Sequence, residues 1–287
     1  MAICGSITGM KRENEMKLIF LDIDGTLVKA GTNTPPASAM EAIRKAQKNG
    51  HKVFLCTGRN IGMAAPVYAL GFDGIIALAG GYVVAEKELI YHQPMPKEDT
   101  EDLLKILHED GVFCTIETTD QSFGDENLSD FLDSAGEGNS EIERWRKALK
   151  ESLGIRPMSE YKGEDAYKIV IMCNDNSQLQ RARDKYEKDY DFVIQEAVGH
   201  GCLNGELINR CFDKGRAVEM VANHYGVNIE DTIGFGDWMN DLKMIETVGT
   251  SLCMGNGAQE LKDISDYVLK NVEDDGLAQG FELLNLV

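Results

Sequence analysis

Several features are missing from this chain of 287 residues, and each absence excludes a class of protein. No apolar run approaches the roughly 18 residues that a membrane-spanning helix needs, so we expect no membrane partner. No C-x-x-C pair occurs, and the seven cysteines are an odd number, which argues against a zinc ribbon or a disulfide framework. Residues 1–16 lack the apolar stretch of a signal peptide. These absences predict a reduced, cytoplasmic protein.

Positive charge is also scarce in the sequence. Lysine and arginine together number 29 against 48 aspartate and glutamate residues, and the net charge is −19. A field of that sign repels phosphate backbones, so we expect no nucleic-acid partner. The same field should repel a small phosphorylated ligand, and any site for such a ligand must overcome it locally.

The two ends of the chain share a rhythm of short apolar runs and helical segments. Such alternation of strand and helix is typical of a parallel sheet with helices on its faces. Each apolar run is bounded by turn residues, as expected of strands buried on both sides. The strands predicted in these two parts are 18–21, 53–56, 75–78, 231–235, 251–254 and 267–269.

The middle of the chain follows a different pattern, in which strand-like pieces alternate less regularly with polar helices. At roughly 150 residues per domain, the length fits about two domains. We therefore predict a doubly wound, Rossmann-like α/β core with a parallel sheet, made of residues 17–82 and 200–287. An inserted α+β domain is expected at 83–199, and residues 1–16 are expected to form an N-terminal extension.

Two carboxylates, Asp22 and Asp24, follow the first predicted strand. The alternation of side chains along a strand would put both on the same side. Ligands of parallel α/β sheets bind beyond the carboxyl ends of the strands, so both acids should face a crevice there. Gly25 permits a sharp exit from the strand. An isolated Asp-Gly pair is equally compatible with an ordinary turn, whereas a calcium loop fits poorly because Thr26 does not continue the ligand pattern.

A second acidic cluster, Gly236-Asp237-Trp238-Met239-Asn240-Asp241, ends a later strand of the same predicted sheet. Carboxylates that converge beyond strand ends cannot all stay ionised without a cation. Oxygen ligands favour a hard ion, and Mg²⁺ is the usual one at phosphate sites. The sequence therefore predicts a metal site that joins the two acidic clusters through Asp22, Asp24, Asp237 and Asp241.

Groups suited to an anion are expected near the same edge of the sheet. Thr57 and Gly58 follow the second predicted strand, where a hydroxyl and a backbone N–H can hold an anion. Lys214 opens a predicted helix, at the end where the helix dipole itself favours an anion. A lysine in that position is explained if an anion is bound between its ammonium group and the start of the helix. For this residue taken alone, a solvated surface lysine is the plainer alternative.

These motifs, in this order, resemble those of the haloacid dehalogenase superfamily. The matching segments are Asp22-Ile23-Asp24-Gly25-Thr26-Leu27, Thr57-Gly58-Arg59, Lys214-Gly215 and the cluster that begins at Gly236. The long insertion between the second and third motifs looks like the type IIB cap of the Cof-type subfamily. The C-terminal run Met254-Gly255-Asn256-Gly257 also resembles that subfamily. The likeness extends over nearly the whole chain from Lys17.

The resemblance implies a role for each matching residue. Asp22 would be the nucleophile that forms an aspartyl-phosphate, and Asp24 would protonate the leaving oxygen and then activate water. The groups that would bind or orient the phosphate are Thr57, Gly58, Lys214 and Asn240. Mg²⁺ would be held by Asp22, Asp237 and the backbone C=O of Asp24, with Asp241 as a further ligand or a supporting acid.

Three further expectations concern residues around these motifs. The subfamily usually carries an Asn-Gly pair after the third core strand, where this chain has Gly80-Gly81-Tyr82, so substrate contacts at the hinge are expected to differ. His200 and Asn204, near the return from the cap, are candidates for contact with the leaving group. Arg59 is expected to form a structural ion pair and not to act as a catalytic group.

Together these features predict a Mg²⁺-dependent phosphatase acting on a small phosphorylated metabolite, expected to be a sugar phosphate. A phosphomutase of the phosphomannomutase kind shares the motif order and cap type and stays open as an alternative. A non-catalytic protein that binds a phosphometabolite is disfavoured, because such a sensor needs no nucleophile at Asp22. A Rossmann dehydrogenase is excluded, because Gly234-Phe235-Gly236 is not followed by x-x-Gly.

Overall fold

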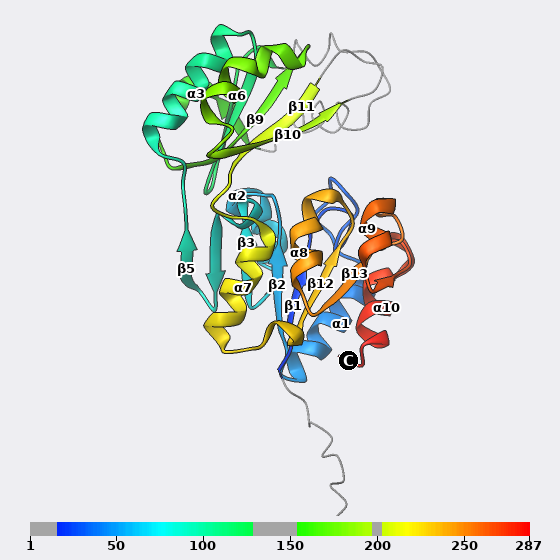
Figure 1. Ribbon diagram of the computed structural model, residues 1–287. Coiled ribbons are helices and arrows are strands. Elements are labelled where there is room, and N and C mark those ends of the chain that lie inside the picture. The colour runs from blue at the N-terminus through cyan, green and yellow to red at the C-terminus, as the bar shows by residue number, and fades with distance from the viewer. Residues whose placement is uncertain (1–15, 129–153, 197–202) are drawn as a thin grey trace, which may run out of the picture.

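A computed structural model of the chain describes residues 16–128, 154–196 and 203–287. Two sheets account for its strands, one of eight strands and one of six. Figure 1 shows them one above the other, and we refer to the larger sheet with its helices as the core and to the smaller as the cap. In the described residues, no helix is long and apolar enough to cross a membrane.

The core sheet has the strand order β14-β13-β12-β1-β2-β3-β4-β5. The six strands from β14 to β3 are parallel, and β4 and β5 are antiparallel to their neighbours. The strands are β1 Leu18–Leu21, β2 Lys52–Cys56, β3 Gly74–Ala77, β4 Tyr82–Ala85, β5 Glu88–His92, β12 Thr232–Gly236, β13 Thr250–Cys253 and β14 Tyr267–Val268. All six predicted strands therefore exist, with bounds that differ by at most one residue.

Helices cover both faces of the core sheet (Figure 1), so the prediction of a doubly wound α/β core is confirmed. Residues of β1 show why: Ile19 and Leu21 pack against α1 and α10, whereas Leu18 and Phe20 pack toward α7 and α8. A strand buried on both faces has no polar side, which is why its sequence is an unbroken apolar run. The core helices are α1 Ala37–Lys48, α2 Ile61–Tyr68, α7 Lys214–Tyr225, α8 Leu242–Thr247, α9 Gln259–Ile264 and α10 Gly276–Leu283.

The cap sheet has the order β10-β11-β9-β6-β7-β8 and is antiparallel except between β7 and β8. Two helices pack on one of its faces, in a cluster that joins Leu103 and Leu107 to Ile169 and Ile171. The cap elements are α3 Lys97–Glu109, β6 Phe113–Thr118, β7 Ser122–Gly124, β8 Ile155–Pro157, β9 Ala166–Cys173, α6 Gln180–Tyr186, β10 Tyr190–Glu196 and β11 Leu203–Asn209.

The chain passes from the core sheet to the cap sheet and back at positions other than the predicted boundaries, 82/83 and 199/200. The segment after residue 83, expected in the inserted domain, forms the hairpin β4–β5 and extends the core sheet. The short turn Leu78–Gly80 reverses the chain directly after β3, so the next strand pairs with β3 itself. Residues 203–209, expected in the core, form β11 in the middle of the cap sheet. Two short linkers join the core to the cap. Residues 93–96 connect β5 to α3, and residues 210–213 connect β11 to α7.

The linkers explain the glycine that departs from the subfamily pattern. Gly80 has a φ of +109°, and a Cβ atom at this position would lie 2.4 Å from the backbone oxygen of Asp213. A side chain therefore does not fit where the returning linker crosses the turn after β3. The turn at Gly80 therefore packs directly against the linker backbone, where an asparagine side chain has no room.

Candidate active site

Three of the four predicted metal-binding carboxylates converge at the carboxyl ends of β1 and β12. These strands are paired in register, Leu21 with Phe235, so the residues that follow them are neighbours. One oxygen atom from each of Asp22, Asp237 and Asp241 lies within 4.8 Å of the others. Asp241 ends the short turn Met239–Asp241, which folds its carboxylate back to accept hydrogen bonds from the Asp237 N–H at 3.0 Å and the Trp238 N–H at 3.4 Å.

A buried lysine joins this acidic cluster. Lys214 is the first residue of α7, and its Nζ donates to Asp22 Oδ1 at 2.7 Å and also to Asp241 Oδ1. The helix begins there because the Asp213 side chain caps it, accepting from the Arg216 N–H at 2.8 Å. The lysine is only 2% exposed, so the alternative of a solvated surface residue is excluded.

The electrostatics of the cluster favour a cation. Three carboxylates face one ammonium group, and burial followed by the charge of Asp241 raises the pKa of Asp22 well above its usual range. The same two causes raise the pKa of Asp237 to about 7. Although burial opposes it, the charges of Asp22 and Asp241 raise the pKa of Lys214. Oxygen-only donors with excess negative charge suit a hard divalent ion, which would replace the protons that these raised pKa values call for.

Gly25 lets the two halves of the cluster approach each other. Its φ is +87°, and a Cβ atom there would lie 2.1 Å from Asp237 Oδ2. Glycine is therefore required both by the backbone conformation and by the close approach of the carboxylate. The neighbouring Thr26 hydroxyl donates to Asp237 Oδ1 at 3.3 Å, which holds the carboxylate against the loop after β1.

The Asp24 carboxylate lies outside the group of three that could share a metal ion. Strand β1 ends at Leu21, so side-chain alternation does not extend to residue 24, which lies in the turn that follows. The guanidinium of Arg59 binds the Asp24 carboxylate with two hydrogen bonds, from Nε and Nη2, each of 2.7 Å. The expected ion-pair role of Arg59 is confirmed, and the metal cluster contains the other three carboxylates without that of Asp24.

The remaining predicted residues differ in burial and in the element that carries them. Thr57 is buried at the end of β2, and its Oγ1 accepts from the Arg59 N–H at 3.1 Å, which leaves the hydroxyl proton available to an anion. Its own N–H, however, donates to the Ile76 oxygen. Asn240 is exposed on the turn before Asp241. Asn204 lies in β11 of the cap, and His200 falls outside the described residues.

The structure adds a cation that sequence reasoning overlooked. Lys168 of β9 is buried, and its Nζ lies 3.9 Å from the point where a Cβ atom on Gly58 would stand. The cap therefore touches the core beside the predicted phosphate-binding loop. A single charged residue inside the apolar strand Ala166–Cys173 was the available signal.

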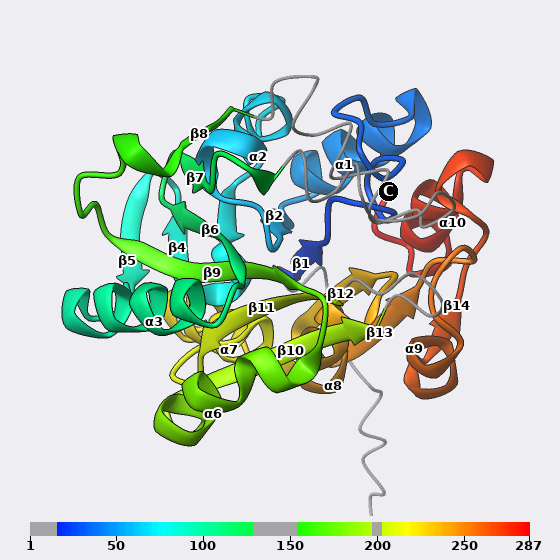
Figure 2. The ribbon, with the colours of Figure 1, turned by 90° about the horizontal axis from the view of Figure 1, so that it is seen from above.

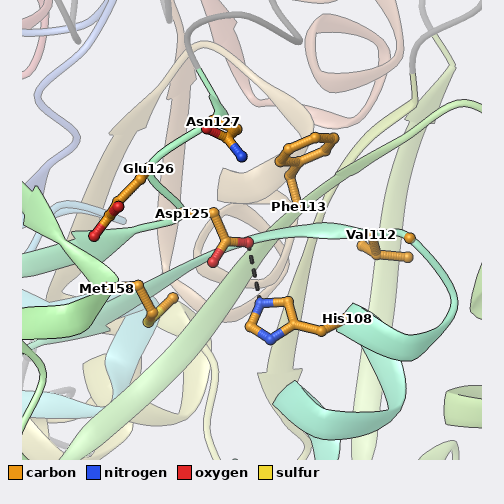
Figure 3. Close-up of a pocket in the computed structure, with 8 residues that line it drawn as sticks. His108, Val112, Phe113, Asp125, Glu126, Asn127 and Met158 are labelled. Carbon is orange, nitrogen blue, oxygen red and sulfur yellow. Dashed lines mark hydrogen bonds and ion pairs between the residues drawn. The ribbon is translucent and has the colours of Figure 1, made fainter.

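A separate cavity of about 400 Å³ lies in the cap, beside the end of α3 (Figure 3). His108 Nε2 and Asp125 Oδ2 are 3.0 Å apart there, and the same carboxylate oxygen accepts from the Cys114 N–H at 2.7 Å. These three residues lie close enough to hold a metal ion. Their mutual hydrogen bonds already account for the arrangement, which ties α3 to β6 and to the end of β7.

Comparison with known proteins shows the family of this chain. The Bacillus subtilis protein YkrA is 30% identical over 277 residues, covering 95% of this chain and 99% of that protein. The 5-amino-6-(5-phospho-D-ribitylamino)uracil phosphatase YwtE of the same organism is also 30% identical, over 281 residues, covering 92% and 96% of the two chains.

Solved structures share the fold of both sheets. The HAD subclass IIB sugar phosphatase BT4131 superposes with a TM-score of 0.75 at 21% identity, covering 95% of this chain and all of that one. The expected resemblance to a core with a type IIB cap is thus confirmed at the level of fold. A family model of haloacid dehalogenase-like hydrolases matches residues 19–281, and the chain belongs to that family of enzymes.

Proposed function

We propose that the protein is a Mg²⁺-dependent phosphatase that hydrolyses a small phosphorylated metabolite, a sugar phosphate being the expected kind. One observation carries the proposal: the Asp22 carboxylate lies buried at a sheet end, hydrogen-bonded to Lys214 and surrounded by Asp237 and Asp241. A nucleophile, a cation for the phosphoryl oxygens and a divalent-metal site are thereby brought together. The similarity to YwtE, a 5-amino-6-(5-phospho-D-ribitylamino)uracil phosphatase, supports the same class of reaction.

Asp22 would attack phosphorus and form an aspartyl-phosphate. Since Lys214 holds Oδ1 of Asp22, the geometry favours Oδ2 as the attacking atom. The new O–P bond forms as the bond from phosphorus to the ester oxygen breaks, and the leaving alcohol takes a proton from Asp24. Water then attacks phosphorus, gives its proton to Asp24, and inorganic phosphate leaves Asp22. Two steps with a covalent intermediate replace one much slower hydrolysis.

Positive charge is required around the transferred phosphoryl group. Lys214 Nζ, held between Asp22 and Asp241, would contact phosphoryl oxygens together with the Thr57 hydroxyl. Asp22, Asp237 and Asp241 would hold Mg²⁺, and the bound ion would supply further positive charge to those oxygens. The backbone C=O of Asp24 is a further ligand in the family to which this chain belongs.

The proposed acid role of Asp24 conflicts with its ion pair to Arg59. A guanidinium with two hydrogen bonds to a carboxylate favours the charged form, whereas the first step needs Asp24 protonated. We infer that Asp24 gives up at least one of these bonds when substrate binds. The cap would supply substrate selectivity, because its sheet lies above the carboxyl ends of the core strands (Figure 1).

The test is Asp22→Asn, assayed for phosphate release from p-nitrophenyl phosphate with Mg²⁺. Loss of the nucleophile should lower kcat by at least about 10³-fold. The matched control is Asp231→Asn, which removes an acid paired with Lys17 at the opposite end of β12 and should stay near the unaltered rate. Retained activity in Asp22→Asn contradicts the nucleophile assignment. With a sugar phosphate as substrate, an isomerised ester in place of inorganic phosphate would indicate a mutase.

A further inference from the structure

The predicted phosphate-binding loop, residues 57–60, is bonded to the core along one side. The N–H of Thr57 donates to the Ile76 oxygen at 2.8 Å, and the Thr57 oxygen accepts from the Ala79 N–H at 3.1 Å. These bonds tie the start of the loop to β3 and to the turn that follows it. The end of the loop, where the chain enters α2, is held by other partners.

Those partners belong to the cap. Asn60 is fully buried and caps α2, because its Oδ1 accepts from the Met63 N–H at 2.8 Å. Its Nδ2 donates to Oγ of Ser122, the first residue of β7, at 3.1 Å. Figure 2 shows β7 beside α2, although the strand belongs to the cap and the helix to the core. One side-chain amide therefore serves both the helix and the cap.

The two residues after Asn60 extend this contact to the turn between β6 and β7. The Ile61 N–H lies in the first turn of α2, where a helix supplies no acceptor of its own, and it donates to the Thr119 oxygen at 2.8 Å. A Cβ atom on Gly62 would lie 2.0 Å from the Asp120 oxygen, so glycine is required for the turn to come this close. A helix of the core is thus completed by backbone of the cap.

The contacts of the loop alternate between core and cap. The core bonds the backbone of Thr57 and also that of Arg59, whose oxygen accepts from a core N–H at 2.9 Å. The cap lies against the residues between and after them, with Lys168 Nζ 3.9 Å from a Cβ atom built on Gly58 and Ser122 bonded to the last residue of the loop. The Thr57 hydroxyl is therefore presented by a loop that is fixed from both sides.

We propose that Asn60 is a positioning residue for the phosphoryl group. Through its hydrogen bond to Ser122, the docked cap holds the loop in the conformation that receives phosphate. This inference rests on the proposed function, in which the Thr57 hydroxyl binds phosphoryl oxygens. It follows that affinity for phosphate depends on a hydrogen bond between core and cap that the phosphate itself does not touch.

The experiment measures the inhibition constant of inorganic phosphate against hydrolysis of p-nitrophenyl phosphate with Mg²⁺. Asn60→Ser keeps a hydroxyl that can cap α2 but is too short to reach Ser122, and Ser122→Ala removes the same bond from the cap side. Each should raise the inhibition constant at least about threefold, as expected for one lost hydrogen bond. The double variant should stay within about threefold of the larger single effect, because both changes remove one interaction.

Amide hydrogen exchange separates docking of the cap from folding of the helix. The Ile61 amide donates to the cap, whereas the Ala64 amide donates to the Asn60 oxygen inside α2 at 2.9 Å. In Ser122→Ala, exchange should become faster at Ile61 and stay near its original rate at Ala64. Gly62→Ala should do the same, since its Cβ displaces the cap turn while alanine suits a helix. Unchanged exchange at Ile61, or equal acceleration at both amides, overturns the inference.

The control is Asn49→Ser, which removes an amide donor bonded to the Leu286 oxygen at 3.1 Å, near the start of β2 and away from the loop. Its inhibition constant should change by less than about threefold. A smaller rise than this in Asn60→Ser or Ser122→Ala, or a double variant beyond its stated range, overturns this inference alone. If the unaltered protein neither releases phosphate nor is inhibited by it, the proposed function fails and the inference with it.

Discussion

The core and the cap each bury one lysine between two carboxylates, and the two clusters differ in what they need from outside. In the core, Lys214 lies between Asp22 and Asp241 with a third acid, Asp237, close by. In the cap, Lys168 lies between Glu117 and Glu206. Both ammonium groups are almost fully buried.

The difference lies in the surplus charge and in its exposure. The core cluster has three acids for one lysine, and its acids are mostly buried, so the surplus has to be met by protons or by a cation. The cap triad of Glu117, Lys168 and Glu206 has a surplus of one negative charge, and Glu206 is 37% exposed. The buried surplus of the core therefore calls for a cation, whereas water can solvate the surplus of the cap. The net charge of −19 is compatible with a phosphorylated substrate if Lys214 and a divalent ion held by the surplus acids together supply positive charge where the phosphate would bind.

Removing the core lysine should have the largest effect. In Lys214→Met the phosphoryl oxygens lose a preorganised cation, so kcat for p-nitrophenyl phosphate at saturating Mg²⁺ should fall about 10²- to 10³-fold. The loss should persist at high Mg²⁺, because the ion occupies the carboxylates and not the position of Nζ. Steady-state kinetics across a Mg²⁺ series measure this.

The matched comparison is Lys243→Met, a lysine on α8 whose partner Glu246 is exposed. That variant should keep its activity. If Lys214→Met retained more than about a tenth of the original kcat, the core cluster would be a structural ion-pair network like that of the cap, and the contrast between the two lysines would disappear.

Removing the cap lysine should mainly affect stability. Lys168→Met leaves Glu117 buried without its cation, which should lower the free energy of unfolding by about 3–5 kcal/mol. Adding Glu117→Gln should recover at least half of the loss, since the orphaned charge is then removed. Urea unfolding measures the loss of unfolding free energy. Amide hydrogen exchange should become faster in β6, β9 and β11, with little change in β1 and β12.

A solvent-exposed ion pair of the cap provides a comparison for this loss of stability. Lys185→Met breaks the ion pair with Asp102 on the outer side of the cap, whose lysine is 55% exposed, and should cost about 0–1 kcal/mol. Should Lys168→Met cost no more than Lys185→Met, the triad is not a desolvated cluster, and Glu206 would not be held in place by it.

The core was more predictable from sequence than the cap, for reasons visible in particular residues. Strand β1 is an unbroken apolar run and α7 begins at a capped lysine, so both signals are local and both elements were placed correctly. Strand β11 carries the pattern Leu203–Asn209, with glycine, glutamate and two asparagines, and only its pairing with β9 and β10 makes it a strand. The hairpin β4–β5 was assigned to the wrong sheet because alternation gives a strand its faces and not its partner.

The residues of the candidate site were likewise predictable where the signal in the sequence is local. Asp22, Asp237, Asp241 and Lys214 were predicted together because each follows a strand or opens a helix at one edge of the sheet. The position of Asp24 was derived from alternation along β1, but that strand ends three residues earlier, and the contact of Asp24 with Arg59 could not be read from the sequence. Nothing in the sequence links Glu117, Lys168 and Glu206, whose contact depends on the register of three strands that are far apart in the chain.

The smallest expected effect concerns the outer side of the cap and its dependence on pH. The hydrogen bond with Asp125 raises the pKa of His108 above its ordinary value of 6.5, against the opposing effect of burial. A raised pKa in the folded state means that the stabilisation is fully present below about pH 6.5 and is lost as pH rises through the folded value. The stability difference between the unaltered protein and His108→Gln should therefore be larger at pH 5.5 than at pH 8.5. Because the histidine is 40% exposed, the difference should stay below about 1 kcal/mol. Urea unfolding at the two pH values tests this prediction. A stability difference that grows toward pH 8.5 would contradict it. In that case His108 and Asp125 would be held together by something other than a hydrogen bond, such as a metal ion bound with Cys114.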